Sequence, residues 1–170
     1  SEQYLAAGIG TPKQYMTIHS GMNIEPFVRT PPVPRKNELV VGKVARLFRQ
    51  KGHEYLFEAA PRIVEAVPNV KFLLVGDGIL REQWERRAER MGLRDRFEFA
   101  GLVPPEEMPG YIARMDVLVH LSLREGLPRT LPQALACGKP VVAFDVDGAR
   151  EVCLDGTTGY LIRAEDSAGV

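Results

Sequence analysis

The amino-acid sequence predicts an α/β fold, in which a mostly parallel sheet is covered by helices on both faces. Short, continuous apolar runs, which are typical of strands buried on both sides, alternate with segments whose apolar residues recur at helical spacing. Pro precedes or Gly follows several of the helical segments, as is common at helix ends. Strands that alternate with helices imply right-handed crossovers, and hence parallel pairing within one sheet.

The individual elements can be assigned in chain order. Strands are expected at residues 38–45, 70–76, 97–101, 116–122, 140–144 and 158–162. Helices are expected at residues 56–67, 80–91, 106–115 and 131–136. Pro61 lies within the first of these helices and should bend or restart it, because proline lacks the backbone donor that a helix interior needs. The arrangement is Rossmann-like, and ligands of such sheets bind beyond the carboxyl ends of the strands.

The composition argues against several classes of protein. The 22 Lys and Arg residues balance the 22 Asp and Glu residues, so a nucleic-acid-binding or polybasic membrane-binding surface is not expected. The apolar runs are far shorter than the roughly 18 residues of a transmembrane helix, and no secretory leader is expected. Cys137 and Cys153 are therefore expected to be reduced thiols of a cytosolic protein. His19, His53 and His120 stand singly, outside any metal-binding spacing, and are expected to be structural.

Two cations stand on the loop after the first expected strand. Arg46 and Lys51 are five residues apart, and Gly52 follows where the next helix is expected. A helix N-terminus attracts anions rather than cations, so the pair is explained if an anion such as a diphosphate binds between them and the helix. A solvated loop that also carries Arg49 explains the same residues equally well.

Two other loops carry motifs for which a turn is the favoured interpretation. The Gly-Asp-Gly segment at 76–78 follows a strand, but Arg81 stands where a dinucleotide-binding fingerprint needs its third glycine. Asp145 and Asp147 resemble a metal-binding D-x-D pair. Two carboxylates alone make a poor cation site, however, and Asp is common before Gly in turns.

The segment 125–133, EGLPRTLPQ, follows the expected strand at 116–122. Glu125 would project at the carboxyl edge of the sheet, and Gly126 lets the backbone approach a ligand closely. The amides before the helix at 131–136 have no intrahelical partner and suit phosphate oxygens, while the carboxylate suits sugar hydroxyls. A capped helix entry with a surface glutamate has equal weight on spacing alone.

Taken together, these segments resemble the C-terminal, donor-binding domain of a retaining glycosyltransferase with the GT-B fold, in family 4 of these enzymes. IHSGMNIEPF is similar to the family's interdomain segment, and VGKVARLFRQKGHEYLFEAA to its Val-Gly-Arg…Lys-Gly block. FLLVGDG, FEFAGLV, MDVLVHLSLREGLP and ALACGKPVVAFDVDGAREVCLDGTTGYLI are similar to the blocks that follow. The resemblance covers nearly the whole chain in the family's order.

The resemblance implies a domain organisation. Residues 1–20 would be the tail of an N-terminal domain, and residues 21–38 a Pro-rich interdomain linker in which the four prolines of 25–36 break regular structure. Residues 39–170 would be the Rossmann-like donor-binding domain, one half of a GT-B fold, truncated at its C-terminus. The acceptor-binding N-terminal domain would be missing, so the fragment alone is expected to be inactive.

The resemblance also implies a donor site. Arg46 and Lys51 would grip the diphosphate, and Glu125 would accept hydroxyls of the donor sugar; these are the expected catalytic residues. The other expected donor-binding residues are Gly42, Val103 (whose backbone would meet the base), Gly126, Leu127, Pro128, Arg129, Thr130 and Gln133. The family usually has a second glutamate at the position of Gln133, where it holds the ribose hydroxyls. An amide can accept and donate there, but without charge assistance.

The implied activity is retaining transfer of a hexose-type sugar from a UDP- or GDP-linked donor. No metal is expected, because cations and amides would stabilise the leaving diphosphate. The acceptor would be a sugar, lipid or other small molecule bound by the missing domain, in polysaccharide, glycolipid or glycoconjugate synthesis. The protein is expected in the cytoplasm or at the inner face of the membrane, with any membrane contact through the missing domain. Alternatives are a sugar-nucleotide epimerase of the same fold and an inactive sugar-nucleotide-binding module.

Overall fold

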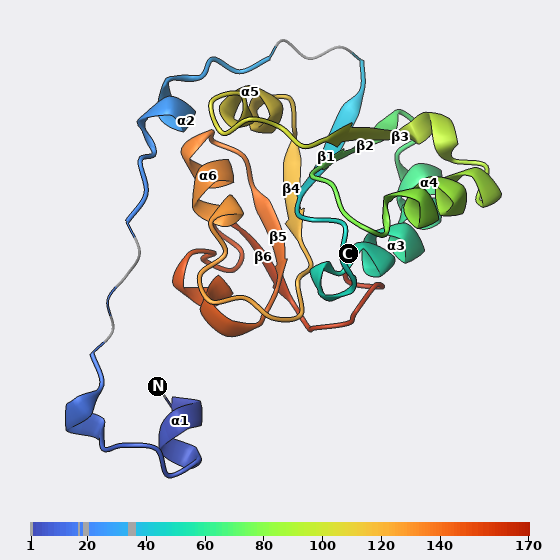
Figure 1. Ribbon diagram of the computed structural model, residues 1–170. Helices are drawn as coiled ribbons and strands as arrows, with labels where there is room; N and C mark the ends of the chain where they lie inside the picture. The colour runs from blue at the N-terminus through green and yellow to red at the C-terminus, as the bar shows by residue number, and fades with distance from the viewer. Residues whose placement is uncertain (1, 17, 19–20, 34–36) are drawn as a thin grey trace.

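The computed structural model describes residues 2–16, 18, 21–33 and 37–170. Within them, six strands form one sheet with helices on both faces (Figure 1). The strands are β1 (Leu39–Val44), β2 (Val70–Val75), β3 (Phe97–Gly101), β4 (Val117–His120), β5 (Val141–Phe144) and β6 (Gly159–Ile162). The α-helices are α1 (Glu2–Ala6), α2 (Glu25–Arg29), α3 (His53–Ala66), α4 (Arg81–Arg90), α5 (Met108–Ala113) and α6 (Thr130–Ala136). Short 3-10 helices are η1 (Pro12–Gln14), η2 (Arg49–Lys51), η3 (Arg94–Arg96) and η4 (Asp147–Glu151).

The sheet has the strand order β3-β2-β1-β4-β5-β6, and each pair of neighbouring strands is parallel. The chain starts at the centre of the sheet, builds outward through β2 and β3, and then returns to β4 on the other side of β1. The carboxyl ends of β1 and β4 therefore form the point where the strand order reverses, which is where doubly wound sheets bind ligands. The predicted Rossmann-like α/β fold is confirmed.

The core lies on both faces of the sheet, because successive residues of a strand point to opposite sides. On the face covered by α3 and α4, Phe97 stacks on Phe72 and Phe57, with ring centroids 4.6 and 4.5 Å away, beside the buried Trp84. On the other face, Leu73 packs in a second cluster with apolar residues of α2, α5 and α6. Each fully buried large apolar side chain stabilises the fold by about 1.5–3 kcal/mol.

Of the two effects expected of Pro61, a restart of the helix is wrong. Helix α3 runs without interruption through this residue. Pro61 is exposed, whereas Phe57 and Ala60 of the same helix are completely buried. The burial of these apolar side chains outweighs the hydrogen bond that the proline removes.

A second difference lies in the Pro-rich segment, where α2 forms although no regular element was expected. Pro26 falls in the first turn of this helix, where a missing N–H costs nothing. Phe27 is buried, and its carbonyl accepts a hydrogen bond from Sγ of Cys137 at 3.5 Å. Packing against α6 thus holds the short helix in place. Cys137 and Cys153 are free thiols.

Helix α1 lies apart from the sheet (Figure 1), and Tyr4, Ile9 and Met16 are exposed. His19 lies outside the described residues. In the part of the chain that the structure describes, no helix has the length and apolar character needed to cross a membrane.

Candidate functional site

A cavity of about 460 Å³ opens at the carboxyl edge of the sheet, where β1 and β4 lie side by side. The expected site residues that line it are Arg46, Lys51, Val103, Glu125, Leu127, Pro128, Arg129 and Thr130. The lining is completed by Val44, Ala45, Val75, Gly76, Leu102, Met108 and His120. The loops after four neighbouring strands thus converge on one space.

Lys51 and Glu125 form an ion pair inside this cavity, in which Nζ of Lys51 donates to Oε1 of Glu125. The two residues are 74 positions apart, and their side chains are only 19% and 23% exposed. Burial by itself would raise the pKa of Glu125, but the hydrogen bond and charge of Lys51 outweigh it and hold the pKa below its ordinary value. The carboxylate is therefore ionised at neutral pH and ready to accept hydrogen bonds.

Arg46 brings a second positive charge to the same cavity. Its guanidinium lies over the ring of Phe48, 5.1 Å from the centroid, and this stacking limits the orientations of a side chain on an exposed loop. Arg49 is exposed and does not line the cavity. Of the three cations on this loop, Arg46 and Lys51 line the cavity and Arg49 does not.

The loop that carries Glu125 is braced by the loop after β5. The backbone N–H of Glu125 donates to Oδ2 of Asp147 at 2.7 Å, and that of Gly148 donates to the carbonyl of Gly126 at 3.2 Å. Asp147 adopts a left-handed conformation with φ of 48°, which is uncommon for a residue with a side chain. A Cβ on Gly148 would stand 2.6 Å from the carbonyl oxygen of Gly126, so only glycine permits this approach.

Asp145 does not join Asp147 in a pair of carboxylates. Two guanidinium nitrogens of Arg150 donate to its oxygens, and these hydrogen bonds lower the pKa of Asp145. No group of three or more His, Cys, Asp and Glu side chains able to hold a metal ion occurs among the described residues. Asp145 pairs with Arg150, and Asp147 holds the loop that carries Glu125.

Among the lining residues that the sequence interpretation missed, His120 is the titratable one. It ends β4, with a side chain only 6% exposed, and lines the cavity. Nδ1 lies 3.2 Å from Oγ1 of Thr130, and Nε2 lies 3.9 Å from Oε1 of Glu125. Burial, aided by the charge of Lys43, lowers the pKa of His120 to about 4, so the ring is neutral near pH 7. The sequence did contain a signal for this role, because His120 stands at the end of an apolar strand, on the ligand-binding edge of the sheet.

Three expected residues lie outside the cavity wall. Gly42 is buried within β1, where a Cβ would stand 2.0 Å from Sδ of Met115, so packing accounts for the glycine. Gln133 is half-buried in α6 and is not part of the lining. Gly126 borders a neighbouring hollow of about 480 Å³, together with Arg124, Glu125 and Asp147.

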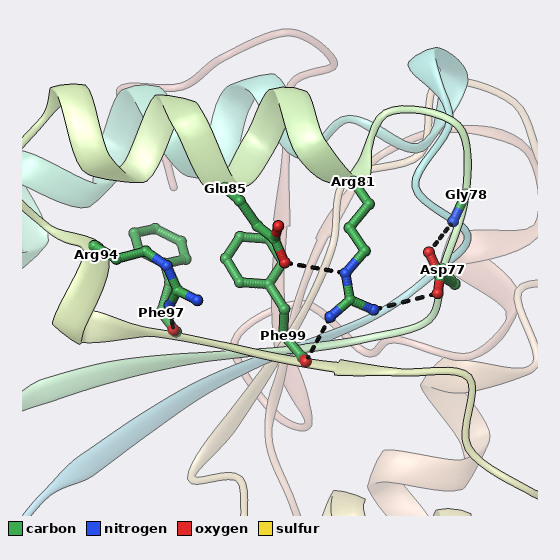
Figure 2. A network of polar contacts seen from close by, with 7 residues as sticks. All are labelled: Asp77, Gly78, Arg81, Glu85, Arg94, Phe97 and Phe99. Carbon is green, nitrogen blue, oxygen red and sulfur yellow. Dashed lines mark hydrogen bonds and ion pairs between the residues drawn. The ribbon is translucent and has the colours of Figure 1, made fainter.

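Arg81 joins the loop after β2 to strand β3 (Figure 2). Its Nε donates to Oε1 of Glu85 at 3.0 Å, Nη1 to Oδ2 of Asp77 at 3.2 Å, and Nη2 to the carbonyl of Phe99 at 3.4 Å. Oδ1 of Asp77 in turn accepts a hydrogen bond from the N–H of Gly78 at 2.7 Å. This network ties the loop after β2, which forms part of the cavity wall, to strand β3.

The Gly-Asp-Gly segment leads from β2 toward a turn at Ile79 and Leu80 and is packed on the loop after β1. Gly76 has a φ of 131°, and a Cβ there would stand 2.2 Å from the carbonyl oxygen of Ala45. A Cβ on Gly78 would stand 2.6 Å from the carbonyl oxygen of Leu47, whose N–H donates to the carbonyl of Asp77 at 2.9 Å. Close backbone approach explains both glycines, and the turn at Ile79 and Leu80 then leads into α4.

Residues 25–169 match the family model described as glycosyl transferases group 1. The chain belongs to this family. Among curated proteins, this group 1 chain is 34% identical over 148 residues to the 2-deoxystreptamine N-acetyl-D-glucosaminyltransferase of Streptomyces fradiae, covering 86% of the chain and 35% of that protein. The chain therefore spans about a third of this relative's length.

Solved structures show the same architecture. Anabaena Alr3699/HepE in complex with UDP and glucose matches with a TM-score of 0.80 and 28% identity, over 98% of this chain and 47% of that one. The UDP-glucose complex of the same protein gives a TM-score of 0.82 and 27% identity, over 99% and 48%. These structural neighbours of the group 1 domain are GT-B glycosyltransferases, so the chain has the fold expected for one half of a GT-B protein.

Proposed function

We propose that the chain is the donor-binding part of a retaining family 4 glycosyltransferase, which takes a hexose-type sugar from a UDP- or GDP-linked donor. One observation carries the proposal: Arg46, Lys51 and Glu125 reach a single cavity at the carboxyl edge of the sheet. The cavity volume of about 460 Å³ lies in the usual range for small-molecule sites. The UDP and UDP-glucose bound to Anabaena HepE support a nucleotide-sugar ligand.

The residues have complementary chemistry toward such a donor. Arg46 and Lys51 attract the diphosphate and stabilise the charge that develops on it as the sugar departs, a role that needs no metal ion. The carboxylate of Glu125 accepts hydrogen bonds from sugar hydroxyls, and burial strengthens these bonds. Val103 and Leu102 offer the apolar wall of the cavity to the base.

The rest of the proposed activity concerns parts of the protein beyond this domain. An N-terminal domain binds the acceptor, which is a sugar, lipid or other small molecule in polysaccharide, glycolipid or glycoconjugate synthesis. The chain alone is then inactive, and the complete enzyme works in the cytoplasm or at the inner face of the membrane. Incubating the complete protein with donor alone separates the alternatives: an epimerase converts the donor, a transferase also needs an acceptor, and a binding module does neither.

Calorimetric titration of this chain with UDP, GDP and their hexose conjugates in EDTA tests the donor site. We expect binding without added metal, and Lys51→Ala should weaken it by about 1.5–3 kcal/mol, the range for a hydrogen bond to a charged group. The loss should lie at the upper end, because the variant also removes the positive charge that offsets Glu125 beside the phosphates. Arg49→Ala is the matched control on the same loop and should bind as the wild type does. Equal losses in the two variants, or binding only with Mg²⁺, would contradict the proposal.

A further inference from the structure

Oε1 of Glu125 lies between two nitrogens. It accepts a hydrogen bond from Nζ of Lys51 and lies 3.9 Å from Nε2 of His120, which is about 1 Å longer than a normal N–H···O bond. Nε2 of His120 is buried and has no hydrogen-bond partner within the described part of the chain. A buried, unpaired ring nitrogen beside an ionised carboxylate is unfavourable unless the two meet at some stage.

The other ring nitrogen determines what Nε2 can do. Nδ1 of His120 lies 3.2 Å from the hydroxyl of Thr130, and the ring carries one proton because it is neutral. If the hydroxyl donates to Nδ1, the proton stands on Nε2 and faces the negative oxygen of Glu125. The opposite tautomer would direct a lone pair at that oxygen. Electrostatics therefore favours the Nε2–H form, which is a donor aimed at the carboxylate.

Diphosphate binding and the ion pair compete for Lys51. When Lys51 turns toward a diphosphate, Glu125 loses the hydrogen bond that now fixes Oε1. Its backbone cannot follow, because the N–H of Glu125 is held by Asp147 at 2.7 Å. A side-chain movement of about 1 Å is enough to bring Oε1 within hydrogen-bond distance of Nε2 of His120.

We propose that His120 is a positioning residue, which takes Oε1 of Glu125 through Nε2–H when Lys51 turns to the diphosphate, and so directs the other carboxylate oxygen to the donor sugar. This inference rests on the proposed donor site. It assigns His120 to the sugar rather than to the diphosphate, since the diphosphate contacts belong to Arg46 and Lys51.

Comparing UDP with UDP-glucose isolates the sugar, and GDP with GDP-mannose replaces this pair if the chain selects guanine. We expect His120→Leu to weaken UDP-glucose binding about tenfold or more and UDP binding by a clearly smaller factor. Both ligands lose the hydrogen bond from His120 to Glu125, but only UDP-glucose also loses the directed contact of the other carboxylate oxygen with the sugar. His120→Gln supplies an N–H donor and should restore most of the loss. Equal weakening of both ligands, or no weakening of either, overturns the proposal. If the wild type binds neither ligand, the donor site itself fails.

A spectroscopic measurement on the wild type gives an independent test, which decides the matter even if His120→Leu does not fold. Long-range ¹H–¹⁵N NMR of labelled histidine identifies the tautomer, with His120 assigned from the spectrum of His120→Gln. We expect the Nε2–H form, and a downfield shift of that proton when UDP or UDP-glucose is added, because either diphosphate draws Lys51 away from Glu125. An Nδ1–H form, or no shift of that proton with either ligand, contradicts the proposal.

Discussion

Lys43 is a buried charge whose removal should stabilise the protein. It lies on β1 with only 2% of its surface exposed. Burial lowers its pKa from 10.5 to about 7, although the negative charge of Glu54 on α3 opposes the shift. Between pH 7 and 10.5 the unfolded chain therefore holds a proton that the folded chain has released. Stability from this group rises with pH across that window and is lost as pH falls toward 7.

The size of the effect follows from the two pKa values. The gap between 10.5 and about 7 corresponds to roughly 5 kcal/mol at about 1.36 kcal/mol per pKa unit. Methionine is also unbranched and of similar length, and it carries no charge. We expect Lys43→Met to raise the free energy of unfolding by about 2–5 kcal/mol at pH 7, with the gain nearly gone near pH 10.5.

Urea unfolding of both proteins at several pH values between 7 and 10 measures this gain. The difference between variant and wild type should shrink by about 1.4 kcal/mol per pH unit, because one proton is involved. Lys71→Met on the neighbouring strand β2 is the control, since Nζ of Lys71 donates to the carbonyl of Asp95 near the surface. A pH-independent difference, or a variant less stable than the wild type at pH 7, would show that Lys43 stays charged and contributes to stability.

Two further predictions concern the edges of the site. Gln133→Leu should leave UDP affinity unchanged within about twofold, since Gln133 is not part of the cavity lining. A tenfold loss of UDP affinity in calorimetry, without a matching loss for 2′,3′-dideoxy-UDP, would show instead that Gln133 contacts the ribose hydroxyls. Asp147→Ala should lower the free energy of unfolding by about 1–3 kcal/mol and weaken UDP-glucose binding, because the N–H of Glu125 loses its acceptor. Asp147→Asn keeps a hydrogen-bond acceptor and tolerates a positive φ, so its stability and UDP-glucose affinity should resemble those of the wild type. An equal loss of stability in both variants would mean that the charge of Asp147 matters rather than its hydrogen bond.

The strands were predictable because a buried parallel strand leaves a continuous apolar run in the sequence. The strand expected at 97–101 has the observed bounds of β3, and the others differ by one or two residues at their ends. Helix starts were less predictable. Helix α3 begins at His53, three residues before the expected start, because a buried polar residue interrupts the apolar pattern.

The site was predictable as a set of loops but not as a set of contacts. Arg46, Lys51 and Glu125 each follow a strand at the ligand-binding edge, but their spacing alone left a structural interpretation equally open, and the resemblance to the family was needed to name them as site residues. The pairing of Lys51 with Glu125 joins segments 74 residues apart, and the support from Asp147 comes from 22 residues away. No local pattern encodes such distances, and for the same reason His120 was taken for a structural residue.

The geometry around Glu125 depends on strand register rather than on any single motif. Lys51 follows β1, Glu125 and His120 belong to β4 and its loop, and Asp147 follows β5. A slip of one residue between β1 and β4 would displace Lys51 by about 3.3 Å along the strand and break the ion pair while every sequence motif stayed intact. In that register Gly42 stands opposite Leu118, and the side chain of Met115 fills the space that a Cβ on Gly42 would occupy. Gly42 does not line the cavity, but it affects the site because it allows this packing and so helps to fix the register of β1 and β4.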